Sequence, residues 1–171
     1  MLKTTGLLLM TFAMIPTAMP AGAQEAVFII RHAEKVATGE DPNLTDQGRE
    51  RAVAWAGMLE RAGIDHVITT SALRTRETGG IVADALGVDR TQVEIADVTG
   101  LVDLLAFDHA ESRVLVVAHE ETIPSILTGL GISNEIDVDP DDYANLFIVT
   151  TPDSEHPVLA HLRMPTAALA P

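Results

Sequence analysis

Two histidines, each at the end of an apolar run, are the residues of this sequence best suited to chemistry. Arg31 and His32 directly follow the run Ala26–Ile30, and His119 directly follows the run Val114–Ala118. A buried strand would normally give way to a turn rich in Gly, Asn or Pro, and here it gives way to Arg and His. A neutral imidazole is a nucleophile and a protonated one is a hydrogen-bond donor, so this pair is suited to group transfer.

Two arginines indicate which group is transferred. Arg31 adjoins His32, and Arg74 follows Ser71 shortly after a second predicted strand. Guanidinium groups are planar, permanently charged forks that match phosphate oxygens, and a helix that begins near Ser71 would add backbone N–H groups to the same anion site. Phosphoryl transfer depends mainly on positioning and charge neutralisation, so such a pocket can work without a metal. We expect the phosphate-binding residues to be Arg31, His32, Ser71, Arg74 and His119.

The elements that would bring these residues together indicate an α/β protein. Apolar runs of strand length alternate with segments of helical period, which is typical of a mainly parallel sheet covered on both faces, a three-layer α/β/α sandwich. The predicted strands are Ala26–Ile30, His66–Thr69, Val93–Ala96, Val114–Ala118, Leu146–Thr150 and Val158–Arg163. Because the carboxyl ends of parallel strands meet at one edge, residues distant in sequence should gather there.

Three segments have apolar residues at helical spacing, starting from Ala52, Thr78 and Ile123. Thr45 is expected to cap the first helix and Ser71 the second. A short amphipathic turn is expected at Leu101–Ala106, and an acidic loop at residues 134–145. The pattern therefore predicts three helices of ordinary length.

The first 23 residues have the order of regions found in secretory signal peptides. A single basic residue, Lys3, precedes the apolar run Gly6–Ile15, and the segment ends in Ala21-Gly22-Ala23. We expect cleavage after Ala23, one domain over residues 24–165, a loose tail at 166–171, and a periplasmic or secreted protein. The formal charge of −14 disfavours nucleic acid and anionic membranes as partners, and the chain has no cysteine for disulfides or a lipid anchor.

Four motifs in order resemble those of the histidine phosphatase superfamily, which has the phosphoglycerate mutase-like fold. They are RHAEK at residues 31–35, LTDQGRERA at 44–52, SALRTRETG at 71–79 and VAHEETIP at 117–124. The short chain is similar to small bacterial phosphohistidine phosphatases and to exported members of that branch. The resemblance implies a phosphatase that needs no cofactor, acting on a small phosphorylated substrate or a phosphohistidine-bearing protein. It implies that His32 becomes phosphohistidine while Arg31, Arg74 and His119 hold the phosphate.

The acid that would protonate the leaving group stays open at this point. Members of the other branch place an acid directly after the second histidine, which corresponds to Glu120 here. Mutase-like members place a glutamate after the third strand, where Asp97 and Asp103 are the nearest candidates. Small phosphohistidine phosphatases can work without a dedicated acid, because a phosphoramidate nitrogen is readily protonated. Gly79, where the family often has Ala, is expected to be a minor departure.

Two alternatives compete with the phosphatase interpretation. A metal site could use His32, Glu34, His119 and Glu120, although the neighbouring arginines would repel a cation. A catalytically weakened module that binds phosphate or a phosphoprotein is the second alternative, because carboxylates beside a phosphate weaken its binding. Glu120 and Glu121 motivate that alternative.

Arg51 is expected on the solvated face of its helix.

Overall fold

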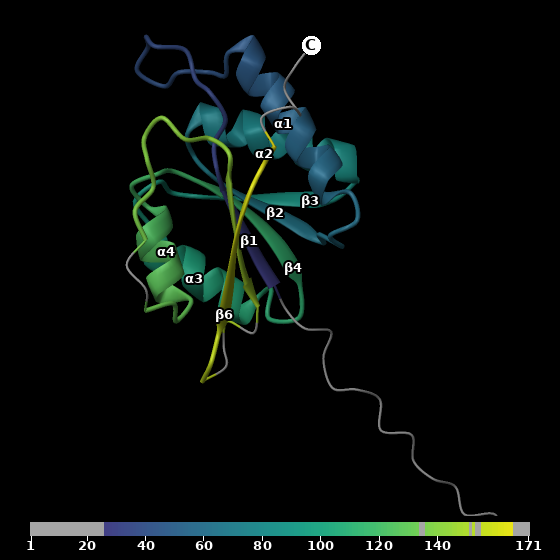
Figure 1. Ribbon diagram of the computed structural model, residues 1–171, viewed down its shortest axis with the longest axis vertical. Helices are drawn as coiled ribbons and strands as arrows, with labels where there is room; N and C mark the ends of the chain where they lie inside the picture. Colours follow the sequence, from purple (N-terminus) through teal and green to yellow (C-terminus); the bar gives the residue numbers. More distant parts are fainter. Residues whose placement is uncertain (1–25, 134–135, 151, 153–154, 166–171) are drawn as a thin grey trace, which may run out of the picture.

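The computed structural model describes residues 26–133, 136–150, 152 and 155–165, so the predicted signal peptide and C-terminal tail lie outside the described residues. The strands are β1 (Ala26–Arg31), β2 (His66–Thr70), β3 (Asp89–Val93), β4 (Arg113–Ala118), β5 (Asn145–Thr150) and β6 (Val158–Arg163). The helices are α1 (Asp46–Leu59), α2 (Leu73–Leu86), α3 (Val98–Phe107) and α4 (Ile123–Gly129). Figure 1 shows their arrangement around one central sheet.

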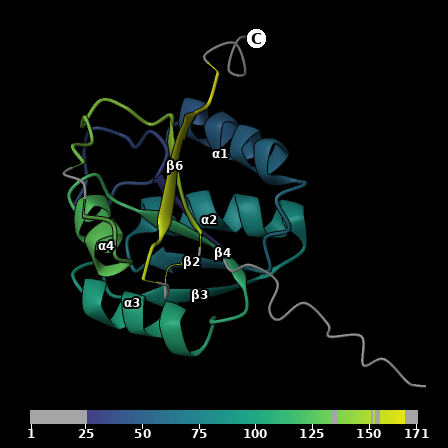
Figure 2. The ribbon, with the colours of Figure 1, turned by 60° about the horizontal axis from the view of Figure 1, so that its bottom comes forward.

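The sheet is mainly parallel, as the sequence predicts. Its order is β3-β2-β4-β1-β5-β6, with β1, β2, β3 and β4 parallel to one another. The last two strands run antiparallel, β5 against β1 and β6 against β5. Helices α1 and α2 cover one face and α3 and α4 cover the other, so the three-layer sandwich is confirmed (Figure 2).

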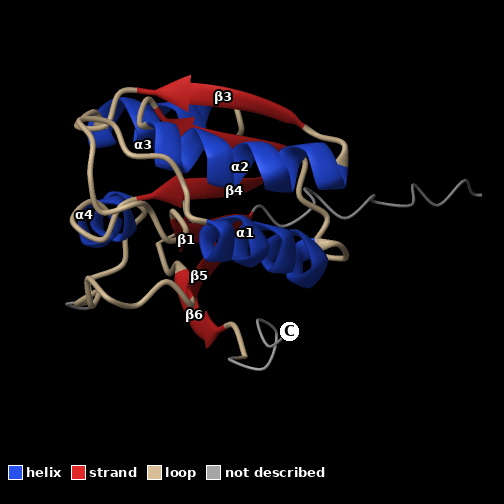
Figure 3. Cartoon of the chain, turned by 90° about the horizontal axis from the view of Figure 1, so that it is seen from above, coloured by secondary structure: helices blue, strands red, loops and turns tan. Residues whose placement is uncertain are grey.

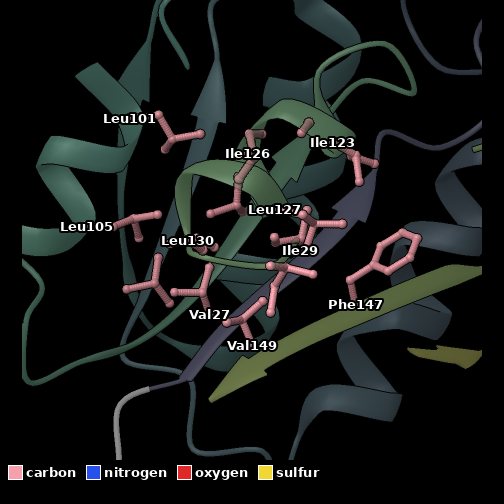
Figure 4. Packing of buried hydrophobic residues seen from close by; sticks show 14 of the residues in the cluster. Val27, Ile29, Leu101, Leu105, Ile123, Ile126, Leu127, Leu130, Phe147 and Val149 are labelled. Carbon is pink, nitrogen blue, oxygen red and sulfur yellow. The ribbon is translucent and has the colours of Figure 1, made fainter. Parts of the chain in front are cut away.

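The central strand β1 shows why the apolar runs are continuous. All six of its residues are buried, because both faces of the sheet are covered. Val27 and Ile29 pack with α3 and α4, in the cluster drawn in Figure 4, whereas Phe28 and Ile30 pack with α1 and α2. Successive side chains of a strand point to opposite faces, so one apolar strand contributes to both cores.

Helix α1 begins where the sequence predicts. The Thr45 side chain caps it by accepting the Gly48 N–H at 3.0 Å. Arg51 in this helix is buried, which contradicts its predicted place on the solvated face. Its Nε and Nη2 donate to both carboxylate oxygens of Glu34 at 2.6–2.9 Å, so the pair fastens the loop after β1 to α1.

Helix α2 is not capped by Ser71, so that prediction is wrong. The N-cap residue is Ala72, which makes no side-chain cap, and the Leu73 N–H instead donates to the Asp41 carboxylate at 2.9 and 3.1 Å. The cap therefore comes from the loop after β1, a long-range contact. The Ser71 hydroxyl donates to Glu94 Oε2 at 3.0 Å.

The third strand also lies elsewhere than predicted. It covers Asp89–Val93 rather than Val93–Ala96, and residues 95 and 96 form the turn that leads into α3. As an edge strand with mostly exposed and polar side chains, β3 lacks the apolar pattern that marks a buried strand. The expected short turn at Leu101–Ala106 is part of the ten-residue helix α3. Within the described residues, no helix has the length and apolar character needed to cross a membrane.

Candidate active site

The two motif histidines lie side by side because their strands are neighbours. β1 pairs with β4 in a register that sets Arg31 beside Ala118, so the next residues of the two strands are His32 and His119. The His32 N–H donates to the Ala118 carbonyl at 2.9 Å, and the two ring centroids are 5.4 Å apart. Figure 3 shows β3 and β4 pointing to the same end of the sheet. Both histidines are almost fully buried at this end.

The hydrogen bond of the His32 ring defines its tautomer. Nδ1 lies 2.8 Å from the Ala33 carbonyl oxygen, which can only accept, so Nδ1 carries the hydrogen. Burial lowers the pKa of His32 to about 3; the Ala33 hydrogen bond opposes this shift, and the charge of Arg31 adds to it. The ring is therefore neutral at neutral pH, and its Nε2 has a free lone pair.

His119 is fixed by partners on both of its ring nitrogens. Arg74 Nη2 lies 3.1 Å from Nδ1, and because a guanidinium only donates, Nδ1 is the acceptor. Nε2 then carries the hydrogen and donates to Thr70 Oγ1 at 2.9 Å, which in turn lies 2.7 Å from Thr75 Oγ1. Burial, together with the Arg74 charge, lowers the pKa of His119 to about 4, so this ring is also neutral.

Three residues contact the Arg31 guanidinium, and two of them belong to the loop before β5. Its Nη1 donates to the Pro140 carbonyl, and its guanidinium carbon lies 4.1 Å from the centroid of the Tyr143 ring. Its Nε lies 2.8 Å from Glu120 Oε2, an ion pair without the alignment of a hydrogen bond. The Tyr143 ring centroid is 6.0 Å from that of His32. The acidic loop therefore borders the histidine pair.

Glu120, a possible proton donor by sequence, is held in its ionised form. Burial alone would raise its pKa, but a backbone hydrogen bond and the charge of Arg31 outweigh burial and lower it. The second possible donor, Asp97, caps α3 by accepting the Gly100 N–H at 2.9 Å. Glu94, which sequence reasoning did not select, directly follows β3 and accepts a hydrogen bond from Ser71. With β3 correctly placed, Glu94 is the first acid after the third strand.

The structure thus brings together Arg31, His32, Arg74 and His119, and it turns the hydroxyl of Ser71 toward Glu94. Besides Glu94, the residues missed by sequence reasoning are Thr70, Pro140 and Tyr143. Thr70 stands next to a motif and could have been found from it, whereas the other two reach Arg31 only through the folded loop. Among the described residues, no three His, Asp or Glu side chains form a metal-binding cluster, and Glu34 binds Arg51 with both of its oxygens.

Known proteins resemble this chain in sequence over residues 27–97 and in fold over most of its length. The sequence profile of the histidine phosphatase superfamily (branch 1) matches residues 27–97. "Probable phosphoglycerate mutase GpmB" of Escherichia coli is 33% identical over 70 residues, which are 37% of this chain and 33% of that protein. The chain therefore matches about a third of the length of these curated relatives.

Solved structures share the fold over most of their length. The protein histidine phosphatase SixA complexed with tungstate matches with a TM-score of 0.67 and 19% identity, covering 81% of this chain and 96% of that one. A phosphoserine phosphatase from Entamoeba histolytica in complex with 3-phosphoglyceric acid matches with a TM-score of 0.62 and 15% identity, covering 85% of this chain and 100% of that one. At these identities the likeness establishes the phosphoglycerate mutase-like fold.

Proposed function

This chain belongs to the histidine phosphatase superfamily, and on that premise we propose that it is a metal-independent phosphatase that works through a phosphohistidine on His32. One observation carries the proposal. The Ala33 carbonyl holds the hydrogen of His32 on Nδ1, and burial keeps the ring neutral, so Nε2 has a lone pair ready to attack phosphorus. This nitrogen acts beside the permanent charges of Arg31 and Arg74.

In the proposed reaction, the phosphoryl group is held by Arg31, Arg74 and His119. The Nε2–P bond forms as the bond from phosphorus to the leaving group breaks, and water then attacks the phosphohistidine and releases phosphate. A bound dianion would draw Arg74 away from Nδ1 of His119 and favour protonation of that nitrogen, which would then donate a hydrogen bond to the dianion. The arginines neutralise charge on the equatorial oxygens, which is the main demand of phosphoryl transfer.

For an ester substrate we propose Glu94 as the proton donor. It follows β3 directly, and its contact with Ser71 places it near Thr70, the hydrogen-bond partner of His119. Glu120 is less suited, since a carboxyl with a lowered pKa seldom carries the proton that it must give. A phosphoramidate leaving group would need no such acid, so Glu94→Gln should slow ester hydrolysis more than phosphoramidate hydrolysis.

The test is hydrolysis of an aryl phosphate by the mature chain in EDTA. We expect activity in the wild type, an acid-labile phosphoenzyme after rapid quenching, and loss of both in His32→Ala. His156→Ala, which changes an exposed histidine between β5 and β6, is the control for the loss of a histidine. Full activity of His32→Ala would contradict the proposal.

A second candidate function is a phosphate-binding module that has lost turnover. The ion pair between Arg31 and Glu120 favours it, because phosphate must compete with a carboxylate for the same guanidinium. Phosphate binding that survives His32→Ala, without a phosphoenzyme in the wild type, would support this function over catalysis.

A panel of small phosphate esters and a phosphohistidine-bearing protein, compared by kcat/KM, would separate the substrate classes.

We also propose that residues 1–23 direct export. The order of a basic residue, an apolar run and small residues ending at Ala23 supports this proposal. Expression of the full chain in a bacterium, followed by fractionation and N-terminal sequencing, tests it. The expected product starts at Gln24 in the periplasm or the medium, and an uncleaved cytoplasmic chain would refute it.

A further inference from the structure

An open hollow between α2 and the edge strand β3 lies outside the residues that the proposed reaction uses. It has a volume of about 380 Å³ and is lined by Thr69, Leu73, Arg76, Glu77, Arg90 and Gln92. Figure 3 shows α2 beside β3 at this edge of the sheet. A second hollow of about 370 Å³ shares Arg76, Glu77 and Arg90 with the first and adds Arg49 and Asp84. Three arginines thus line two hollows that share residues, on a chain with a formal charge of −14.

Among the described residues, the two arginines shared by both hollows have carboxylate partners only at long distances. Arg76 Nη2 lies 4.0 Å from Asp41, and Arg90 Nη1 lies 3.6 Å from Asp84. These distances are longer than charge-assisted hydrogen bonds, so the N–H groups of both guanidiniums remain available to a ligand. Glu77 also lines both hollows, and its Oε2 accepts the Leu44 N–H at 2.7 Å and lies 3.9 Å from Arg49 Nη2, so it offsets part of this positive charge. The hollow therefore offers positive charge with unused donors.

A glycine makes room for one of these guanidiniums. A Cβ on Gly80 would lie only 2.5 Å from Arg90 Nη1, so the guanidinium rests on the backbone surface of α2 at this point. Any larger side chain at Gly80 would displace the far end of Arg90. The absence of a side chain at position 80 thus allows a cation of β3 to lie across the helix and face the hollow.

One carboxylate, that of Asp41, links the hollow to the proposed phosphate site. The Asp41 carboxylate lies 3.9 Å from Arg74, which binds His119, and 4.0 Å from Arg76, which lines the hollow. A substrate whose phosphate contacts Arg74 can therefore extend its leaving group past Asp41 toward Arg76. We propose that this hollow is a subsite for a second anionic group, a carboxylate or phosphate, on the leaving-group side of the substrate. This inference rests on the proposed function of the histidine site.

The experiment compares ligands that differ only in the charge at one end. Phenylphosphonate, 4-carboxyphenylphosphonate and 4-(aminomethyl)phenylphosphonate cannot be hydrolysed, so calorimetric titration of the wild type measures binding even if turnover is absent. We expect the carboxylate to bind about fivefold more tightly than the unsubstituted compound, the scale of one partly exposed ion pair of ~1 kcal/mol. The ammonium compound should bind more weakly than both.

Variants then assign the preference to the hollow. Arg76→Gln and Arg90→Gln should each abolish most of the fivefold preference and leave phenylphosphonate affinity unchanged. Arg61→Gln, an exposed arginine beyond the end of α1, is the matched control and should retain the preference. Equal affinity for the three compounds, or a preference that survives both variants, would overturn the inference. Hydrolysis of phenyl phosphate that depends on His32, measured separately, reports on the proposed function, so the two ideas can fail independently.

Discussion

The two buried histidines predict that the protein loses stability between pH 7.5 and pH 5. The pKa is lowered to about 3 for His32 and about 4 for His119, mainly by burial, whereas an unfolded histidine titrates near 6.5. As the pH falls below 6.5, the unfolded chain binds protons that the folded chain cannot accept. The stabilising contribution is therefore complete above pH 6.5 and is lost as the pH falls toward the folded pKa values.

The size of the loss follows from the same values. At pH 5, His32 and His119 should each contribute a loss of about 2 kcal/mol, together about 4 kcal/mol. A small domain has a free energy of unfolding of about 5–15 kcal/mol, so the effect is a large fraction of the total. The lowered pKa values of Glu120 and Asp142 act at lower pH, because those carboxyls have ordinary values of 4.5 and 3.8.

Urea unfolding at pH 7.5 and pH 5, followed by fluorescence of the single, fully buried Trp55, measures this loss. His32→Gln should lose about 2 kcal/mol less than the wild type over this interval, because it lacks one of the two histidines. Ile126→Val, a buried core change that costs about 1 kcal/mol, should lower the free energy of unfolding equally at both pH values. If His32→Gln loses as much as the wild type, the neutral buried His32 inferred here is wrong.

Three further perturbations test the surroundings of the site. Gly79→Ala should lower the free energy of unfolding, measured by thermal denaturation, by about 1–3 kcal/mol, because the new Cβ would overlap Thr69 Cγ2. An unchanged free energy of unfolding would show that α2 can move away from β2. Tyr143→Leu should raise KM for an aryl phosphate about fivefold, because a ring stacked on Arg31 contributes ~1 kcal/mol. Tyr143→Phe keeps the ring and should leave KM unchanged. Equal effects of the two substitutions on KM would exclude the ring contact. Glu120→Gln should tighten the binding of inorganic phosphate, measured as competitive inhibition, because it removes the charge that competes for Arg31; weaker binding would mean that Glu120 supports the site.

The sequence predicts best the parts of the fold that are buried on both faces. β1 and β4 were found because both are continuous apolar runs, and their pairing places His32 beside His119. The sequence pattern misplaces β3 because an edge strand exposes its side chains, and this hides Glu94 as the first acid after the strand. The Gly79 position, expected to be a minor departure, is in close contact with β2, which only the helix-to-strand distance reveals.

Long-range polar contacts were not predictable, and they change how the site should be understood. The acidic loop looks solvated in sequence, yet Pro140 and Tyr143 hold Arg31 beside the histidine pair. Arg31 is consequently fixed before any substrate arrives, which would reduce the conformational entropy lost on binding phosphate at the proposed site. The cost is that Glu120 already contacts the same guanidinium, so phosphate must displace a carboxylate to use it fully. A substrate that carries a second anion would offset this competition through the proposed contacts with Arg76 and Arg90.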